Sequence, residues 1–397
     1  MSAARSRVLR LGVAGLGRAF TLMWPAFRAD PRIRLMAAAD PREAVRSAFA
    51  REFAARTYST VEALADDPDI DAIYIATPHQ VHAEHVEIAA RAGRHVLVEK
   101  PIAITLAECD RMIAAAEAAG VHLIVGHSHS FDRPIQRARE LIASGAHGPL
   151  GMITALNFGD FLYRPRRPEE LDTARGGGVI FSQAAHQVDI VRLLGGGLVE
   201  TVRASTGNWD RARSTEGAYS AHLTFESGAF ASLTYSGYGH FDTDEFCGGI
   251  SELGAVKDVS RHGTARRALA GVTDAAREAA LKAERGYGGA SFMPAAAAVA
   301  HEHFGVVIAS CRHADIRPLP DRVMIHADTE QTAEMLPPPV IPRVEVIDEL
   351  HAAVVDGRRP PHDGRWARAT LEVCLAILES SRTGREISLT RQTAVPA

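Results

Sequence analysis

Residues 9–20, Leu-Arg-Leu-Gly-Val-Ala-Gly-Leu-Gly-Arg-Ala-Phe, decide the fold, because a short apolar run leads into a glycine-rich turn and a helix-patterned segment. The two turn glycines allow a tight bend and let a pyrophosphate approach backbone N–H groups at a helix N-terminus. Phe20 stands where the common fingerprint Gly-x-Gly-x-x-Gly/Ala has its last small residue, so an ordinary strand-to-helix turn is the alternative. We expect a dinucleotide site lined by Gly15, Leu16, Gly17, Arg18 and Ala19.

An acidic residue supports this site. Asp40 ends the second apolar run, 23 residues after Gly17, where a carboxylate accepts hydrogen bonds from the adenosine ribose hydroxyls. The same charge repels a 2′-phosphate, which favours NAD over NADP, although the nearby Arg42 would soften that preference. A simpler alternative is that Asp40 caps a helix that starts at Pro41.

Apolar runs alternate with helix-patterned segments through the first part of the chain. This alternation is typical of strand-helix-strand units around a parallel sheet with both faces covered. We therefore expect a doubly wound Rossmann domain over residues 1–148. The expected strands are 9–14, 33–39, 72–76, 96–98 and 121–125, and two of the expected helices are 83–92 and 106–119.

The pattern changes in the second half. Residues 216–225 and 229–238 have the pattern of long strands that flank the turn Glu226-Ser227-Gly228. We expect an α+β domain over 149–397 with a mostly antiparallel open sheet, for substrate binding and oligomerisation. Residues 240–305 are Ala-rich and charged, helical near 264–284, and we interpret them as an insertion. A last helix over 365–381 is expected to end near Gly384.

Composition excludes several classes of protein. The chain has 397 residues with 44 Lys plus Arg against 48 Asp plus Glu, so nucleic acid is not expected as a partner. No run of about eighteen apolar residues predicts a membrane span, and no signal peptide is evident. The four cysteines are scattered without a Cys-x-x-Cys pair, which favours reduced thiols and a cytoplasmic protein over disulfides or a zinc site.

Glu99-Lys100-Pro101 directly follows the expected strand 96–98. This position is the carboxyl end of the sheet, where open parallel folds bind their ligands. A lysine there can polarise a hydroxyl or carbonyl and help to move its proton. The alternative is a solvated surface lysine.

Together with the turn glycines, Ala76-Thr77-Pro78, His82, Glu99-Lys100-Pro101 and a glycine run leading to His186-x-x-Asp189 resemble the Gfo/Idh/MocA oxidoreductase family. The resemblance implies that Lys100 and His186 are catalytic and that the protein forms a homodimer or homotetramer. It also implies that further residues bind the cofactor, namely Thr77, Pro78, His79, His82, Glu99 and Lys100.

Two departures from the family pattern stand out. Ser182 occupies the position, four residues before His186, where the family often has an aspartate. His186 would then be oriented through Gln183, Asp189 or water, or would simply pack in its helix. His79 stands where many relatives have asparagine. These departures weigh against sugar or inositol dehydrogenation, and Ser182 is the best support for a non-catalytic NAD-binding sensor.

Residues 163–168, Tyr-Arg-Pro-Arg-Arg-Pro, carry three guanidinium groups between prolines, which suits pairing with carboxylates. A solvated loop or a subunit contact is the alternative. Residues 17–23, 126–130 and 164–172 resemble the branch of the family that oxidises a phthalate cis-dihydrodiol. The resemblance implies NAD-dependent oxidation of an anionic cyclic diol, similar to 4,5-dihydro-4,5-dihydroxyphthalate, to the catechol. The expected substrate-binding residues are His127, His129, Tyr163, Arg164, Arg166, Arg167, Gln183 and His186.

Three histidines spaced by three, His79, His82 and His85, suggest a metal site at first sight. His79, however, directly follows Thr77-Pro78, where family members contact nicotinamide, and no further ligand is evident. We therefore predict no metal.

Overall fold

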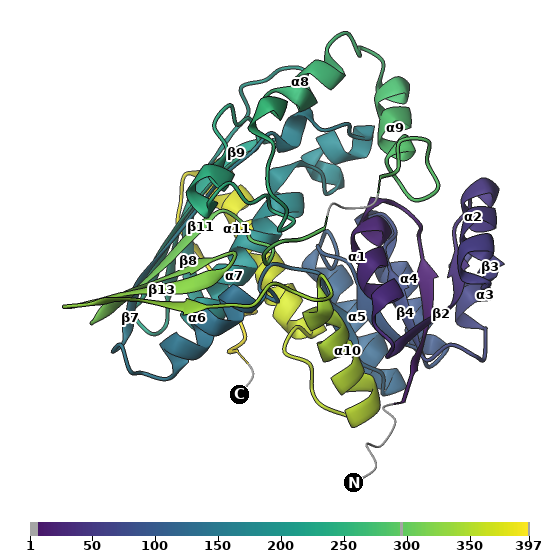
Figure 1. The fold of residues 1–397 in the computed structure, drawn as a ribbon, viewed down its shortest axis with the longest axis horizontal. Helices are drawn as coiled ribbons and strands as arrows, with labels where there is room; N and C mark the ends of the chain where they lie inside the picture. The colour runs from purple at the N-terminus through teal and green to yellow at the C-terminus, as the bar shows by residue number, and fades with distance from the viewer. Residues whose placement is uncertain (1–6, 294–296, 396–397) are drawn as a thin grey trace. The chain divides into compact units, whose positions relative to one another are not determined.

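The computed structural model describes residues 7–293 and 297–395, and the chain divides into two compact units (Figure 1). The first unit contains residues 1–127, 280–295 and 341–368, and the second contains 128–279, 296–340 and 369–397. The sequence predicted one boundary at residue 148. The chain instead leaves the first unit at His127 and returns to it twice.

The first unit is built on a six-stranded parallel sheet in the order β3-β2-β1-β4-β5-β6. This order confirms the predicted doubly wound fold. The chain first adds strands on one side of β1, as β2 and β3, and then on the other side, as β4 to β6, and such folds bind ligands at the change between β1 and β4. The short β3 was not predicted from the sequence. The strands are β1 (Leu9–Ala14), β2 (Ile33–Ala39), β3 (Arg56–Tyr58), β4 (Ala72–Ile75), β5 (His95–Val98) and β6 (Leu123–Val125).

Helices accompany this sheet, as the doubly wound pattern requires. α5 shows why the sequence forms them: Thr105 and Glu108 make a capping box at its start, and Gly120 ends it with φ 65°. The helices are α1 (Arg18–Ala29), α2 (Glu43–Phe53), α3 (Val61–Ala65), α4 (His82–Arg91), α5 (Leu106–Ala119) and, from late in the chain, α10 (Val344–Asp356). α11 (Gly364–Thr383) begins in this unit and ends in the second.

The second unit contains a nine-stranded sheet in the order β14-β13-β12-β11-β7-β10-β9-β8-β15. Every neighbouring pair is antiparallel except β7 and β10, which confirms the predicted mostly antiparallel sheet. The strands are β7 (Leu150–Phe158), β8 (Val199–Gly207), β9 (Ala218–Phe225), β10 (Phe230–Ser236), β11 (Val306–Cys311), β12 (Ala314–Leu319), β13 (Arg322–Ala327), β14 (Gln331–Met335) and β15 (Ile387–Ser388).

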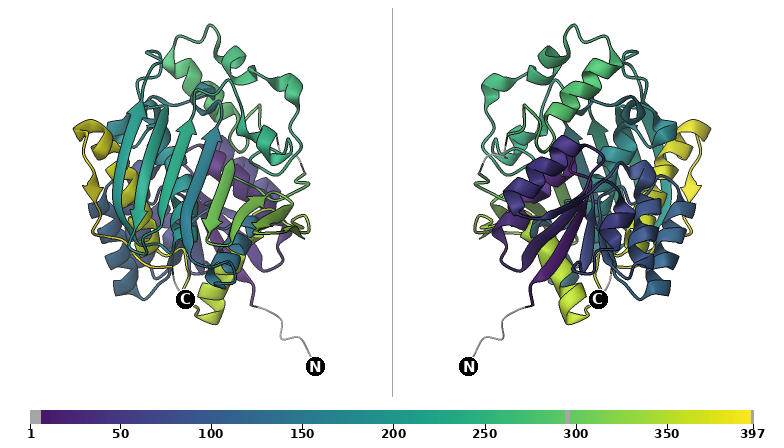
Figure 2. Two further views of the ribbon diagram at one scale, coloured as in Figure 1. Left: turned by 90° about the vertical axis from the view of Figure 1, so that its left-hand side faces the viewer. Right: turned by 90° about the vertical axis from the view of Figure 1, so that its right-hand side faces the viewer.

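Helices α6 (Arg133–Ala143) and α7 (Ala185–Gly195) pack against this sheet. The left view of Figure 2 looks onto the other face of the strands. Burial alternates along β10, from exposed Phe230 to buried Ala231 and Leu233, because successive side chains point to opposite faces. Short helical turns connect these elements: η1 (His79–Val81), η2 (Phe161–Tyr163), η3 (Pro168–Leu171), η4 (Thr173–Arg175), η5 (Ile180–Ala184), η6 (Thr243–Cys247) and η7 (Val259–Arg261).

The expected helix over 264–284 is two helices, α8 (Thr264–Leu269) and α9 (Ala275–Glu284). The break falls at Gly271, whose φ is 79°, a left-handed conformation that no α-helix continues. The predicted terminal helix is α11, and Gly384 follows it with φ 66°.

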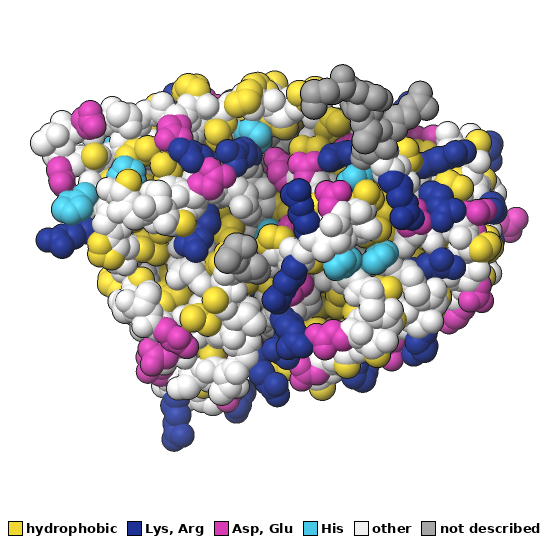
Figure 3. Space-filling view, turned by 90° about the horizontal axis from the view of Figure 1, so that it is seen from below, with side chains coloured by type: hydrophobic (Ala, Val, Ile, Leu, Met, Phe, Trp, Pro, Cys, Tyr) yellow, Lys and Arg dark blue, Asp and Glu magenta, His cyan; other side chains and the backbone are white. Residues whose placement is uncertain are grey.

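None of the helices in the described ranges is long and apolar enough to cross a membrane. Basic and acidic side chains are interspersed over the face in Figure 3.

Candidate active site

The glycine turn after β1 has the geometry that a pyrophosphate site needs. Gly15 has φ 92°, and a Cβ there would lie 2.8 Å from the carbonyl oxygen of Ala76, so only glycine fits. Gly17 is the N-cap residue of α1, and no atom lies within 4 Å of the place its Cβ would take. The first turn of α1 carries no acidic side chain. This helix N-terminus therefore combines open space, backbone donors and a favourable dipole.

Asp40 lies at the end of β2, as predicted, and its carboxylate already has several donors. Oδ2 accepts from Leu16 N at 2.9 Å and from Arg42 Nη2 at 2.8 Å, and Oδ1 accepts from Arg42 N and Nε, both at 2.9 Å. Burial raises the pKa of Asp40, but the hydrogen bonds from Arg42 and Leu16 outweigh burial and hold the pKa below its usual value. The Arg42 guanidinium thus pairs with both oxygens of the Asp40 carboxylate. It is 43% exposed and has room to move.

Histidine side chains hold the loop after β4 in place through contacts with Thr77 and Pro101. His82 Nε2 lies 2.9 Å from the carbonyl oxygen of Thr77, and Nδ1 lies 3.0 Å from that of Pro101. His85 Nδ1 lies 2.9 Å from Thr77 Oγ1. The ring centroids of His79 and His82 are 6.3 Å apart. His82 therefore connects the loops after β4 and β5, and both of its nitrogens face backbone carbonyls.

Lys100 follows β5 at the carboxyl edge of the sheet, next to a buried carboxyl group. Glu99 Oε1 accepts a hydrogen bond of 2.6 Å from the Tyr74 hydroxyl. Burial raises the pKa of Glu99, and the Tyr74 hydrogen bond and the Lys100 charge oppose that shift. The first unit thus brings together the glycine turn, Asp40, the Thr77 loop and Lys100.

His186 lies in the second unit, at the start of α7, and is buried among rings. Its ring centroid is 4.8 Å from that of His129 and 5.1 Å from that of Phe304. Phe304 in turn stacks with Tyr235 at 6.1 Å and an interplanar angle of 9°. His186 therefore lies in a buried cluster of rings, in direct contact with His129 and Phe304.

The side chains near His186 in sequence have other partners. The Ser182 hydroxyl donates to the carbonyl of Gly178, so it bonds within its own helical turn. Gln183 Oε1 accepts from the Tyr235 hydroxyl at 3.3 Å. Asp189 accepts from Ser130 and, at 2.9 Å, from the Thr370 hydroxyl. Hydrogen bonds of three side chains therefore anchor the helix, namely those of Ser182, Gln183 and Asp189.

The arginine loop separates into different environments. The Arg166 side chain is 11% exposed, its guanidinium lies 3.6 Å above the Phe161 ring, and its Nη2 donates to the Phe161 carbonyl at 2.7 Å. Burial lowers the pKa of Arg166 to about 10. Arg167 Nε lies 3.1 Å and 3.4 Å from the carboxylates of Glu169 and Glu170.

Arg164 differs from both neighbours. Its side chain is 44% exposed, and its Nε lies 3.1 Å from Asp160 Oδ1. Tyr163, by contrast, donates its hydroxyl to Asp210 at 2.9 Å, under the Arg266 guanidinium at 3.5 Å from the ring. Of this loop, Arg164 is the guanidinium best placed to meet a dissolved anion.

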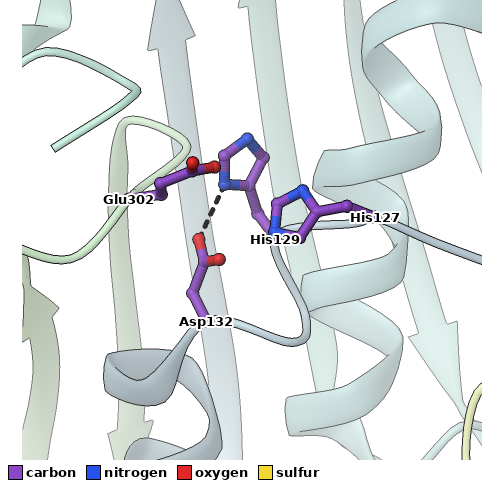
Figure 4. Close-up of side chains that lie close together, drawn as sticks. All are labelled: His127, His129, Asp132 and Glu302. Carbon is purple, nitrogen blue, oxygen red and sulfur yellow. Dashed lines mark hydrogen bonds and ion pairs between the residues drawn. The ribbon is translucent and has the colours of Figure 1, made fainter. Parts of the chain in front are cut away.

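His127 and His129, both predicted to bind substrate, lie beside two carboxylates. Ligand atoms of His127, His129, Asp132 and Glu302 all fall within 4.8 Å of one another (Figure 4). His129 Nδ1 lies 2.7 Å from Asp132 Oδ2, and Nε2 lies 3.5 Å from Glu252 Oε1. Burial lowers the pKa of His129, but Asp132 and Glu252 outweigh burial and raise it to about 9.

Sequence reasoning missed the partners that complete these groups. Tyr235 lies on the buried face of a predicted strand, where alternation indicates burial and nothing more. Phe304, Glu252 and Glu302 fall within the predicted insertion, and no local motif marks them. Asp132 follows the His127-Ser128-His129 motif closely, so its place in the cluster was the most accessible signal.

Comparison with known proteins shows the family to which this chain belongs. Residues 9–127 match the model of an oxidoreductase family with an NAD-binding Rossmann fold, and residues 135–247 match a GFO/IDH/MocA C-terminal domain. The chain is 48% identical, over 98% of each chain, to a 1-carboxy-3-chloro-3,4-dihydroxycyclohexa-1,5-diene dehydrogenase of Comamonas testosteroni. A myo-inositol 2-dehydrogenase of Thermotoga maritima is 31% identical over 49% of this chain and 58% of its own.

Among solved structures, one titled a putative dehydrogenase from Bordetella bronchiseptica has a TM-score of 0.90 at 42% identity. The match covers 96% of this chain and 100% of that one.

Proposed function

Because this chain belongs to the Gfo/Idh/MocA family of NAD-dependent oxidoreductases, we propose that it oxidises the cis-dihydrodiol of a cyclohexadiene carboxylate to the corresponding catechol. The observation that carries the proposal is the aromatic cluster of the second unit, in which the His186 ring lies 5.1 Å from the Phe304 ring and Phe304 stacks with Tyr235. Flat rings of this kind favour a flat, partly unsaturated substrate over a puckered sugar. The near full-length relative, named for such a diene, supports the same choice.

Bound NAD⁺ supplies the hydride acceptor in this reaction. We assign its pyrophosphate to the backbone from Gly15 to Ala19 and its ribose to Asp40, once the Arg42 side chain moves aside. Thr77, Pro78, His79, His82 and Glu99 form the remaining cofactor wall. The structure fits this assignment, because no atom lies within 4 Å of the place a Gly17 Cβ would take and the first turn of α1 carries no acidic side chain.

Lys100 and His186 are the proposed proton carriers. One of them accepts the proton of the substrate hydroxyl while the hydrogen on the same carbon leaves with its electron pair. The product of that step is a ketone, which tautomerises to the catechol without further loss of hydrogen. Formation of the aromatic ring makes the oxidation effectively one-way.

Arg164 is the proposed contact for the ring carboxylate, because its side chain is 44% exposed and its Nε lies 3.1 Å from the Asp160 carboxylate, which a substrate carboxylate can replace. Arg166 stabilises the loop by packing against it. The remaining proposed substrate-binding residues are Arg167, His127, His129, Tyr163 and Gln183. A phthalate-like dicarboxylate is the finer proposal from the sequence. One well-exposed guanidinium supports at least one ring carboxylate.

A substrate panel with purified protein and NAD⁺ tests the proposal by the appearance of NADH absorbance. The panel contains the cis-dihydrodiols of phthalate, of benzoate and of benzene, together with myo-inositol. We expect kcat/KM for the carboxylated diols to exceed that for the benzene diol by about tenfold to a hundredfold, the value of one charged hydrogen bond. Turnover of myo-inositol with no turnover of any dihydrodiol would exclude the proposal.

Single substitutions distinguish the proposed roles of Lys100, His186 and Arg164. Lys100→Met and His186→Asn should each lower kcat by about a hundredfold or more, with melting temperature unchanged. Arg164→Met should remove the preference for carboxylated diols. Arg322→Met is its matched control, because Arg322 is 41% exposed and lies 3.0 Å from Asp321, and it should leave the preference intact. Light scattering tests the predicted homodimer or homotetramer.

A further inference from the structure

The cluster of His127, His129, Asp132 and Glu302 has a donor set that hydride transfer does not require. Two imidazoles and two carboxylates have their ligand atoms within 4.8 Å of one another. His127, His129 and Asp132 are buried, and Glu302 is half-buried. We propose that these four side chains, which lie apart from His79, His82 and His85, bind a divalent cation of the Zn²⁺ class, in contrast to the prediction of no metal made from the sequence.

The chain itself holds most of this site together. Three of the four side chains come from one stretch of six residues, His127 to Asp132, which directly precedes α6. Glu302 joins them from the segment before β11. Figure 4 shows the two rings and the two carboxylates directed toward a shared space. Their proximity therefore follows from a short loop and one neighbouring segment.

The distances suit a small cation. Four ligands about 2.1 Å from a tetrahedral Zn²⁺ stand about 3.4 Å from one another. The largest separation in the cluster, at most 4.8 Å, requires those two ligand atoms to approach each other by at most about 1.4 Å. Mixed nitrogen and oxygen donors favour Zn²⁺ over Mg²⁺, which prefers oxygen ligands and water.

A further carboxylate stands where a metal-binding histidine normally has one. His129 Nε2 lies 3.5 Å from Glu252 Oε1, while Nδ1 faces Asp132 Oδ2 at 2.7 Å. Metal-bound histidines usually donate their other ring N–H to such an outer carboxylate, which fixes the ring orientation. Nδ1 is then the metal-binding nitrogen, and the cation takes the place of the proton that Nδ1 and Asp132 share.

Metal content measures the proposal directly. Protein stripped with a chelator is dialysed against dilute Zn²⁺, and bound metal is counted by mass spectrometry, without NAD⁺ or diol. We expect about one Zn²⁺ per chain and a rise in melting temperature, with no such rise in Mg²⁺. Asp132→Asn and Glu302→Gln should each weaken Zn²⁺ binding at least tenfold, and Glu252→Gln about tenfold to a hundredfold.

The matched control is Asp328→Asn, because Asp328 lies 3.2 Å from His313 in an exposed histidine–carboxylate pair. It should bind Zn²⁺ as the unaltered protein does. No uptake by the stripped protein, or equal uptake by Glu302→Gln, would overturn the proposal. Glu302 is half-buried, so its variant decides the question if Asp132→Asn does not fold. Because no substrate is present, failure here leaves the proposed oxidation untouched.

Discussion

His82 gives the sharpest pH prediction. Its ring is fully buried between the Thr77 and Pro101 carbonyls, at 2.9 Å and 3.0 Å. Burial lowers its pKa from 6.5 to about 4, despite those two acceptors. Between pH 6.5 and about 4 the unfolded chain therefore binds a proton that the folded chain does not. Stability must fall as the pH falls through this window, and the shift corresponds to about 3 kcal/mol.

Urea unfolding at a series of pH values measures this loss. Two of the chain's three tryptophans, Trp24 and Trp366, belong to the first unit, so tryptophan fluorescence reports largely on that unit. His82→Gln should be less stable near neutral pH, because one ring hydrogen bond is lost, at about 1 kcal/mol. Between pH 6.5 and about 4.5 it should lose roughly 2 to 3 kcal/mol less than the unaltered protein.

His240→Gln is the control for removing a histidine, because His240 is exposed. Its pH profile should run parallel to that of the unaltered protein. Equal slopes for His82→Gln and the unaltered protein would refute the reasoning, since the buried imidazole would then have contributed nothing to the acid-side loss.

Three further outcomes follow from single contacts. Gly15→Ala should lower the free energy of unfolding in urea by about 1 to 3 kcal/mol and raise the KM for NAD⁺, because residue 15 has φ 92° and an added Cβ would meet Ala76. The control is Gly93→Ala, which has φ 71° and open space around its Cβ and should leave that KM unchanged. Asp40→Ala should raise the KM for NAD⁺ at least tenfold in initial-rate assays, by about 1.4 kcal/mol or more. Arg192→Lys should lower the melting temperature, at about 2 kcal/mol, because lysine cannot replace the buried bonds to Thr370, Gln392 and Gly197.

The parts of the fold that follow local rules were predictable from the sequence. The glycine turn, the apolar strands and Asp40 are marked by neighbouring residues, and β1 and β2 have the predicted bounds. β3 has only three residues and no fully buried one, so its pattern was too weak to detect. The return of residues 341–368 to the first unit depends on long-range packing that no local pattern encodes.

The sequence proposed the residues of the site, whereas their hydrogen-bond and ring partners came from the structure. Arg42 was expected to modify the cofactor preference; the structure shows that it pairs with Asp40, and its effect on that preference stays a prediction. Ser182 was noted as a departure from the family, but its bond to Gly178 required coordinates. The cluster around His129 was hidden because its carboxylates come from Asp132 and Glu302, far apart in the chain.

The three-part composition of the first unit affects the order in which the protein is made. The edge of β6 is completed when Val125 N donates to the His362 carbonyl at 2.9 Å, and Arg368 Nη1 binds Asp110 at 2.7 Å. On the ribosome, β6 therefore lacks this backbone contact until residue 362 has emerged. We expect a nascent chain halted before residue 341 to expose that strand edge.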